Sequence, residues 1–120
     1  MDRELIYNQI ANDINTYDAN VYVTQRYEPI PQQVPCVFVE MISKARSLQY
    51  ATLCNTDEQY RYSFEVQVFH NTLVEAYALM EYIETKFKAI SFFEEMCMPI
   101  ENTDQRVARI VARFSAQLGA

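Results

Sequence analysis

The stretch Gln59–Asn71, QYRYSFEVQVFHN, decides the fold because it alternates apolar and polar side chains along its length. Aromatic or branched residues take alternate positions from Tyr60 to Val68, and most of the residues between them are polar. A period of two is typical of a β-strand whose two faces meet different surroundings. Twelve residues of strand span about 40 Å, whereas a usual strand has about five or six residues. We therefore expect the strand ends to project beyond the core and to expose unpaired backbone groups.

Composition points to one globular domain. The chain has 120 residues, of which 50% are hydrophobic and 22% are charged, and this length suits a single domain, residues 1–120. No apolar run approaches the ~20 residues that cross a bilayer, so we expect no membrane partner. The sequence begins MDRELIYNQIAND, with mixed charges and helical spacing, and we expect no secretory leader.

Charge, glycine and cysteine content exclude several classes of site. A formal net charge of -6 argues against a protein that grips nucleic acid over its whole surface, although local basic patches remain compatible with it. Gly119 is the only glycine, which excludes a P-loop and a dinucleotide fingerprint. The three cysteines are odd in number, widely spaced and without a C-x-x-C pair, so we expect reduced thiols rather than a disulfide framework or a zinc site: Cys36, Cys54 and Cys97.

The N-terminal third predicts a helix and a short strand. From Asp2 to Tyr17 apolar residues recur at spacings of three and four, which is typical of an amphipathic helix. A brief alternation around Val21 and Val23 predicts a short edge strand. An extended connector follows, because its prolines cannot donate to a β-ladder: Pro29, Pro31 and Pro35.

The middle of the chain predicts a buried strand, a loop and the long strand. Residues 36–43, CVFVEMIS, are mostly apolar and suggest a strand buried on both faces. Residues 44–58 show no regular period, so we expect a loop before the strand at residues 59–70.

A second helix and two strands complete the prediction. Thr72 and Glu75 match a capping box, and apolar spacings of three and four continue to Ile90. Strands are expected at residues 91–100 and 105–117, joined by a turn. The predicted core face of the last strand is Ala108, Ile110, Ala112, Phe114 and Ala116.

These elements give the order α-β-β-β-α-β-β. The predicted fold class is α+β, with a single mainly antiparallel sheet and two helices packed on one of its faces.

No reactive constellation stands out among the titratable residues. His70 is the only histidine, and the sequence places neither a nucleophile nor an orienting carboxylate beside it. Glu94 and Glu95 are adjacent, so on a strand they point to opposite faces. Glu81 and Glu84 are more simply explained as solvated helix residues. We therefore expect no catalytic residue, no metal site and no cofactor.

Arg106, Arg109 and Arg113 form the most informative charged cluster. On a strand, Arg109 and Arg113 share one face and Arg106 lies on the other. They can contact phosphate or a partner's carboxylates. The simpler explanation, which we favour, is cross-strand pairing with a glutamate within the sheet: Glu65, Glu94 or Glu95.

Three segments resemble the small tail terminator proteins of long-tailed bacteriophages. They are YEPIPQQVPCVFVEMI at residues 27–42, NTDEQYRYSFEVQVFHN at residues 55–71 and PIENTDQRVARIVARFSAQLG at residues 99–119. The order of helices and strands around them is similar to that family over nearly the whole chain.

The resemblance implies a structural virion protein at the neck of a phage, made in the host cytoplasm, and not an enzyme. Its expected partners are copies of itself in a hexameric ring, the tail-tube protein and a head-completion (stopper) protein. Genome DNA would pass through the ring without specific binding. The alternatives are another head-tail connector, such as a head-closure or adaptor protein, and a small cellular adaptor that binds by strand addition.

Within such a ring, the loop at residues 44–58 is expected to project and to touch a neighbouring subunit or the tube. The arginines of the last strand are expected to bind carboxylates within or between subunits. The predicted contact residues are Lys44, Arg46, Tyr50, Asp57, Arg106, Arg109 and Arg113.

Overall fold

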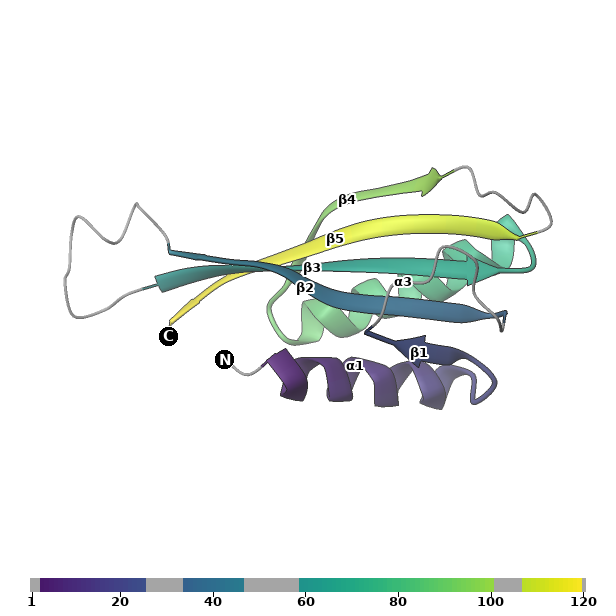
Figure 1. Ribbon diagram of the computed structural model, residues 1–120, viewed down its shortest axis with the longest axis horizontal. Helices are drawn as coiled ribbons and strands as arrows, with labels where there is room; N and C mark the ends of the chain where they lie inside the picture. The colour runs from purple at the N-terminus through teal and green to yellow at the C-terminus, as the bar shows by residue number, and fades with distance from the viewer. Residues whose placement is uncertain (1–2, 26–33, 47–58, 101–106, 120) are drawn as a thin grey trace.

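The computed structural model describes residues 3–25, 34–46, 59–100 and 107–119, and the statements below concern these residues. It confirms the α+β class and the predicted order of elements (Figure 1). The helices and strands are α1 (Arg3–Tyr17), β1 (Tyr22–Thr24), β2 (Cys36–Arg46), β3 (Gln59–His70), α3 (Leu73–Ala89), β4 (Phe93–Ile100) and β5 (Ala108–Gly119).

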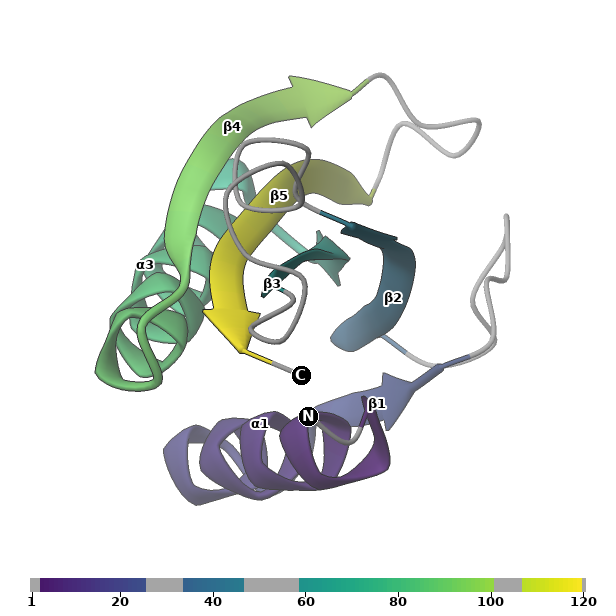
Figure 2. The same cartoon turned by 90° about the vertical axis from the view of Figure 1, so that its left-hand side faces the viewer.

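The strands form one curved sheet in the order β1-β2-β3-β5-β4. β1 pairs with β2 in parallel, and the other neighbours are antiparallel, so the sheet is mixed rather than wholly antiparallel. Viewed along its length, the sheet arches over α1 and α3, which lie on the same side of it (Figure 2). The other face carries no helix in the part of the chain that the structure describes.

The core lies between the helices and one face of the sheet. Residues at every second position of β3 and β5 point toward the helices, as the alternation predicts. Phe87 of α3 stacks on Phe114 of β5 with ring centroids 4.5 Å apart. The buried core residues of the two helices are Ile6, Ile10, Ile14, Ala76, Leu79, Met80, Ile83 and Phe87, and those of β3 and β5 are Tyr62, Phe64, Val66, Val68, Ile110, Ala112, Phe114 and Ala116.

Both ends of α3 are capped. The Thr72 hydroxyl accepts a hydrogen bond from the Glu75 amide at 3.2 Å, which confirms the predicted helix start. At the other end Ser91 takes a left-handed conformation with φ of 70°. Its amide donates to the carbonyl of Lys88, and the Phe92 amide donates to the carbonyl of Phe87. This pattern closes a helix in the Schellman manner, with a serine in the place that glycine usually takes.

Several predicted boundaries are corrected by the hydrogen-bond ladder. β2 runs three residues further than predicted, to Arg46, because Lys44 and Arg46 pair with Tyr62 and Tyr60. Strand pairing here outweighs the local lack of an apolar period. The start of β4 moves from residue 91 to Phe93, since Ser91 and Phe92 complete the cap of α3. β5 runs over Ala108–Gly119 rather than residues 105–117.

The prediction that β3 exposes unpaired backbone groups is wrong. β3 has the predicted length of twelve residues, but β2 pairs with it from Tyr60 to Phe69 and β5 pairs with it from Gln59 to His70. The strand is long because it is the central strand of a three-stranded ribbon. This ribbon does extend beyond the ends of both helices (Figure 1).

Two further findings concern the thiols and the helices. Cys36 is buried and Cys97 is half-buried. Cys54 lies outside the described residues. Neither α1 nor α3 is both long enough and apolar enough to pass through a lipid bilayer.

Candidate functional site

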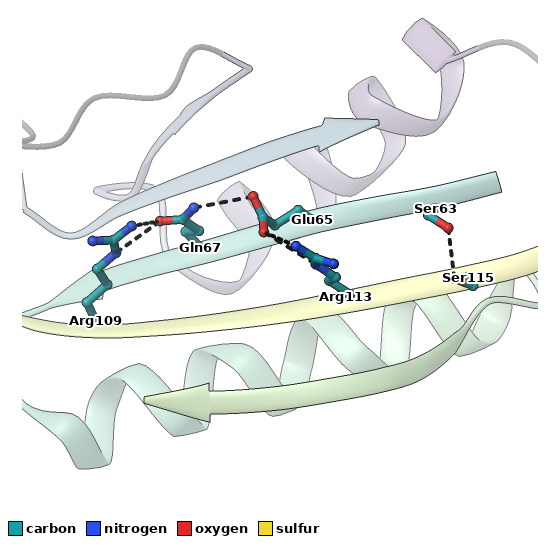
Figure 3. Close-up of polar contacts among 6 residues, drawn as sticks. All are labelled: Ser63, Glu65, Gln67, Arg109, Arg113 and Ser115. Atoms are coloured by element: carbon teal, nitrogen blue, oxygen red, sulfur yellow. Dashed lines mark hydrogen bonds and ion pairs between the residues drawn. The ribbon is translucent and has the colours of Figure 1, made fainter. Parts of the chain in front are cut away.

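The helix-free face of the sheet carries a set of polar side chains on β3 and β5, which we call the polar ladder (Figure 3). These residues occupy the positions of β3 and β5 that alternate with the core positions, so they point away from the helices. Register places Glu65 opposite Arg113 and Ser63 opposite Ser115. The ladder consists of Ser63, Glu65 and Gln67 on β3 and Arg109, Arg113 and Ser115 on β5.

Arg109 is held by the uncharged side chain of Gln67. Its Nε and one terminal nitrogen donate to Gln67 Oε1 at 3.0 and 2.6 Å. Its guanidinium also lies over the ring of Phe69, the residue directly opposite it, at 5.4 Å from the ring centroid. Gln67 is only 6% exposed, so its oxygen depends on Arg109 for these bonds. The sequence did not predict this contact with Gln67.

Arg113 does pair with a glutamate, as the sequence predicts. Its Nε lies 3.5 Å from Glu65 Oε1, and a terminal nitrogen is equally far from the same oxygen. The Arg113 side chain is 49% exposed, and an ion pair this long and exposed contributes well under about 1 kcal/mol. Gln67 Nε2 donates to the other oxygen of Glu65 at 3.4 Å, which links the two arginines into one row.

Glu65 also faces a like charge. Glu40 of β2 lies directly opposite Glu65 on the side away from β5. Carboxylates directly opposite each other on adjacent strands repel, and Arg113 on the other side of Glu65 offsets part of that repulsion. Across β2, β3 and β5, two negative charges, Glu40 and Glu65, are therefore followed by the positive charge of Arg113.

The ladder ends in a hydroxyl chain that crosses three strands. The fully buried Ser115 donates through Oγ to Glu95 Oε1 of β4 at 2.6 Å. Ser63 Oγ lies 3.0 Å from Ser115 Oγ. Because Ser115 gives its one hydroxyl proton to Glu95, Ser63 is the donor in the second bond. The chain ties β3, β5 and β4 together next to the register shift between Glu94 and Met96.

Glu94 points to the opposite face from Glu95, as predicted, and there it meets α3. Burial, the charge of Glu84 and a side-chain hydrogen bond with Glu84 all raise the pKa of Glu94, and Lys88 partly opposes them. Lys88 itself pairs with Glu84 at 3.6 Å. Burial is also the main cause that raises the pKa of the Cys97 thiol, with further contributions from Glu94 and Glu84. This thiol is therefore held in its protonated, less nucleophilic form.

His70 has a carboxylate beside it that the sequence did not place. Its Nδ1 lies 2.8 Å from Glu75 Oε2, at the first turn of α3, and also 2.9 Å from the Asn71 amide nitrogen. Neither contact supplies a nucleophile. Across the described residues, no group of three or more histidine, cysteine or acidic side chains is arranged to hold a metal ion.

The structure separates the predicted contact residues. Lys44 and Arg46 lie on β2 rather than in a loop, opposite Tyr62 and Tyr60. Arg109 lies opposite Phe69, nine residues along β3 from Tyr60, which is about 30 Å of strand. Lys44 and Arg46 therefore cannot act together with Arg109 within one chain. The predicted contact residues Tyr50, Asp57 and Arg106 fall outside the described residues.

Sequence reasoning missed Gln67 and Ser115. Gln67 belongs to the polar face of the alternating stretch, but only the register of β3 against β5 shows that it lies within reach of Arg109. The sequence predicted only glutamates as partners for the arginines within the sheet, and Gln67 is uncharged. Ser115 lies between alanine and phenylalanine in the sequence, and nothing there signals its bond to Glu95.

Comparison with known proteins supports the fold alone. No family model matches the sequence, and a search of curated proteins gives no match. Among solved structures, the fold is similar to that of a chain in the virion of a native gene transfer agent particle, with a TM-score of 0.59. The alignment covers 96% of this chain and 95% of that chain at 10% sequence identity. An identity this low assigns no residue of the polar ladder a role.

Proposed function

We propose that this chain is a structural virion protein of a phage-like particle. The observation that carries this proposal is the fold similarity to a chain of a gene transfer agent virion, which extends over almost the whole of both chains. Because neither chain leaves a large part unmatched, the similarity concerns a complete domain rather than a common supersecondary unit. The sequence resemblance to tail terminators, based on the prolines before β2 and the long strands, points the same way.

Within the virion we propose a ring at the neck that caps the tail tube, stops its growth and joins the tail to the head-completion protein. The subunit is elongated, 51 × 27 × 21 Å along its principal axes, and a closed ring of six copies is the assembly that the resemblance implies. Lys44, Arg46, Tyr50, Asp57, Arg106, Arg109 and Arg113 remain our candidates for contact with a neighbour or with the tube.

Arg109 and Arg113 differ in how strongly each is already bound within the subunit. Arg109 is already bound by Gln67 and stacked on Phe69, so its charge is largely occupied within the subunit. Arg113 is 49% exposed and held only by long contacts to Glu65. Arg113 is therefore the better residue to bind a carboxylate of another subunit.

Charge supports a channel that lets DNA slide. Each Lys or Arg that contacts a phosphate adds salt-dependent affinity and slows passage of the polymer. The chain has sixteen acidic and ten basic residues. We propose that the bore of the ring is lined mainly by acidic and neutral side chains, so that DNA passes without specific binding.

The test is removal of the gene, followed by electron microscopy of the particles. Loss of a tail terminator should give tails of uncontrolled length and heads without tails. Full-length tails of normal, uniform length beside heads that leak DNA would instead identify a head-closure or adaptor protein. Unchanged particles that lack the protein would refute a virion role and favour a cellular adaptor.

A further inference from the structure

Two strands of the ribbon each have a stretch on the outer side that no described strand covers. β1 pairs with Cys36–Phe38, so from Val39 to Arg46 no described strand pairs with the outer side of β2, and we call this stretch open. β4 pairs with β5 only from Arg109 to Ser115, so the outer side of β5 is open from Ala116 to Gly119. Both open stretches end in the part of the ribbon that extends past the helices (Figure 1).

The two open stretches lie at the same level of the ribbon. Ala45 of β2 and Gln117 of β5 are both directly opposite Arg61 of β3, on its two sides. Beyond the register shift between Met41 and Ser43, the ladder of β2 is regular from Ser43 to Arg46. Three regular residues on one edge, Lys44–Arg46, therefore lie level with three residues on the other, Ala116–Leu118.

The edges differ in how they are protected against strand addition. β4 has a register shift, two glutamates and Pro99, and β1 is only three residues long. Proteins use such features to block pairing with another chain. The sequence Ala116–Gly119, AQLG, has no charge and no proline, and its ladder with β3 is regular. The end of β5 is therefore an unprotected edge.

We propose that the open end of β5 in one copy pairs with the open end of β2 in the next copy. The proposal rests on the proposed function, in which copies of this chain assemble with one another. β2 and β5 both run antiparallel to β3, so the new pair is parallel when neighbouring copies point the same way. This contact is head-to-tail, and such contacts form either closed rings or open filaments. Because the two edges lie at the same level, the step between copies has little rise, which favours a ring.

Disulfide trapping tests this pairing with the variant Ala45→Cys/Gln117→Cys. Within one chain these positions are separated by β3, about 10 Å apart, which exceeds the ~7 Å limit for a disulfide. A new disulfide must therefore join two chains. After oxidation of assembled protein with diamide, we expect a ladder of covalent oligomers that collapses to monomer on reduction.

The controls separate specific pairing from random oxidation. The parent chain, with its three native cysteines, sets the background. An equal mixture of Ala45→Cys and Gln117→Cys should stop at dimers, because each chain then has only one new thiol. Arg46→Cys/Leu118→Cys provides an independent pair, since both residues lie opposite Tyr60.

The outcomes distinguish this inference from the proposed function. Oligomers seen by native mass spectrometry without a ladder in either double variant would overturn the edge pairing and leave the virion role intact. Cross-links to a different virion protein, rather than to a second copy, would also overturn it. A chain that forms no oligomer at any concentration and is absent from particles would refute the proposed function as well.

Discussion

Replacing Arg109 by methionine should destabilise the protein because it leaves a buried amide oxygen without its donors. Methionine keeps much of the apolar stem but removes both hydrogen bonds to Gln67 Oε1, at 3.0 and 2.6 Å. Gln67 is 6% exposed, so water cannot easily replace them. An unsatisfied buried acceptor costs about 1–3 kcal/mol, and the contact with Phe69 adds about 0.5–1 kcal/mol. We expect the free energy of unfolding to fall by about 2–3 kcal/mol.

A double-mutant cycle with Gln67→Leu assigns this loss to the Arg109–Gln67 pair. Removing both partners leaves no unpaired acceptor, so Arg109→Met/Gln67→Leu should cost less than the sum of the single variants. We expect a coupling free energy of about 1.5 kcal/mol or more, measured by urea unfolding followed by circular dichroism.

Arg113→Met is the matched control because it makes the same change on the same face of β5. Arg113 is 49% exposed and its contacts to Glu65 are 3.5 Å long, so this variant should lose less than about 1 kcal/mol. Burial of Gln67 would be refuted as the reason why Arg109 is important for stability if both arginine variants lost the same free energy of unfolding. It would also be refuted if the effects of the single variants in the cycle were additive.

Three other predictions follow from local features. Ser91→Gly should raise the free energy of unfolding by about 0.5–1 kcal/mol, because φ at this residue is 70°. Ala78→Gly, at an exposed position inside α3, should lower it by a similar amount, and a Ser91→Gly protein no more stable than the parent would contradict this. The pKa of Glu94 is raised, so the protonated form of Glu94 stabilises the folded protein. This stabilisation is fully present below the ordinary glutamate pKa and is lost as pH rises through the raised pKa. Glu94→Gln should therefore stabilise the protein at pH 7, and the gain over the parent should disappear on acidification; a gain that does not change with pH would exclude ionisation as its cause. Deletion of Gln49 to Asn55 should leave the circular dichroism spectrum largely unchanged but impair tail-length control or head joining, and particles with normal tails and heads would count against a contact role for that segment.

The periodic parts of the fold could be predicted from the sequence because burial of one face imposes a pattern. Strand β3, helix α3 and the core face of β5 all show it, and all three are confirmed. Strand ends were not predictable in the same way. Lys44 and Arg46 belong to β2 because they pair with residues of β3. The local sequence of residues 44–46 does not indicate this pairing.

The candidate site was less predictable because it depends on register. The sequence indicates that Arg109 and Arg113 share a face, but it does not indicate which residue of β3 lies opposite each of them. Shifting the register by two residues would place Arg109 opposite Gln67 or Asn71 and change every bond of the polar ladder. Side-chain periodicity is unaffected by such a shift, so the pattern alone cannot choose among these arrangements.

Two chains of this fold with low sequence identity can share contacts made by the backbone more readily than contacts made by particular side chains. At 10% identity with the gene transfer agent chain, a bond such as that between Arg109 and Gln67 requires particular side chains and has no reason to be kept. Strand addition uses backbone N–H and C=O groups, which every residue except proline supplies. An assembly based on open strand edges can therefore persist while side chains diverge, provided that prolines stay out of the pairing segment. Ala116–Gly119 meets that condition, and for this reason we place the contact between copies at the end of β5 rather than in the polar ladder.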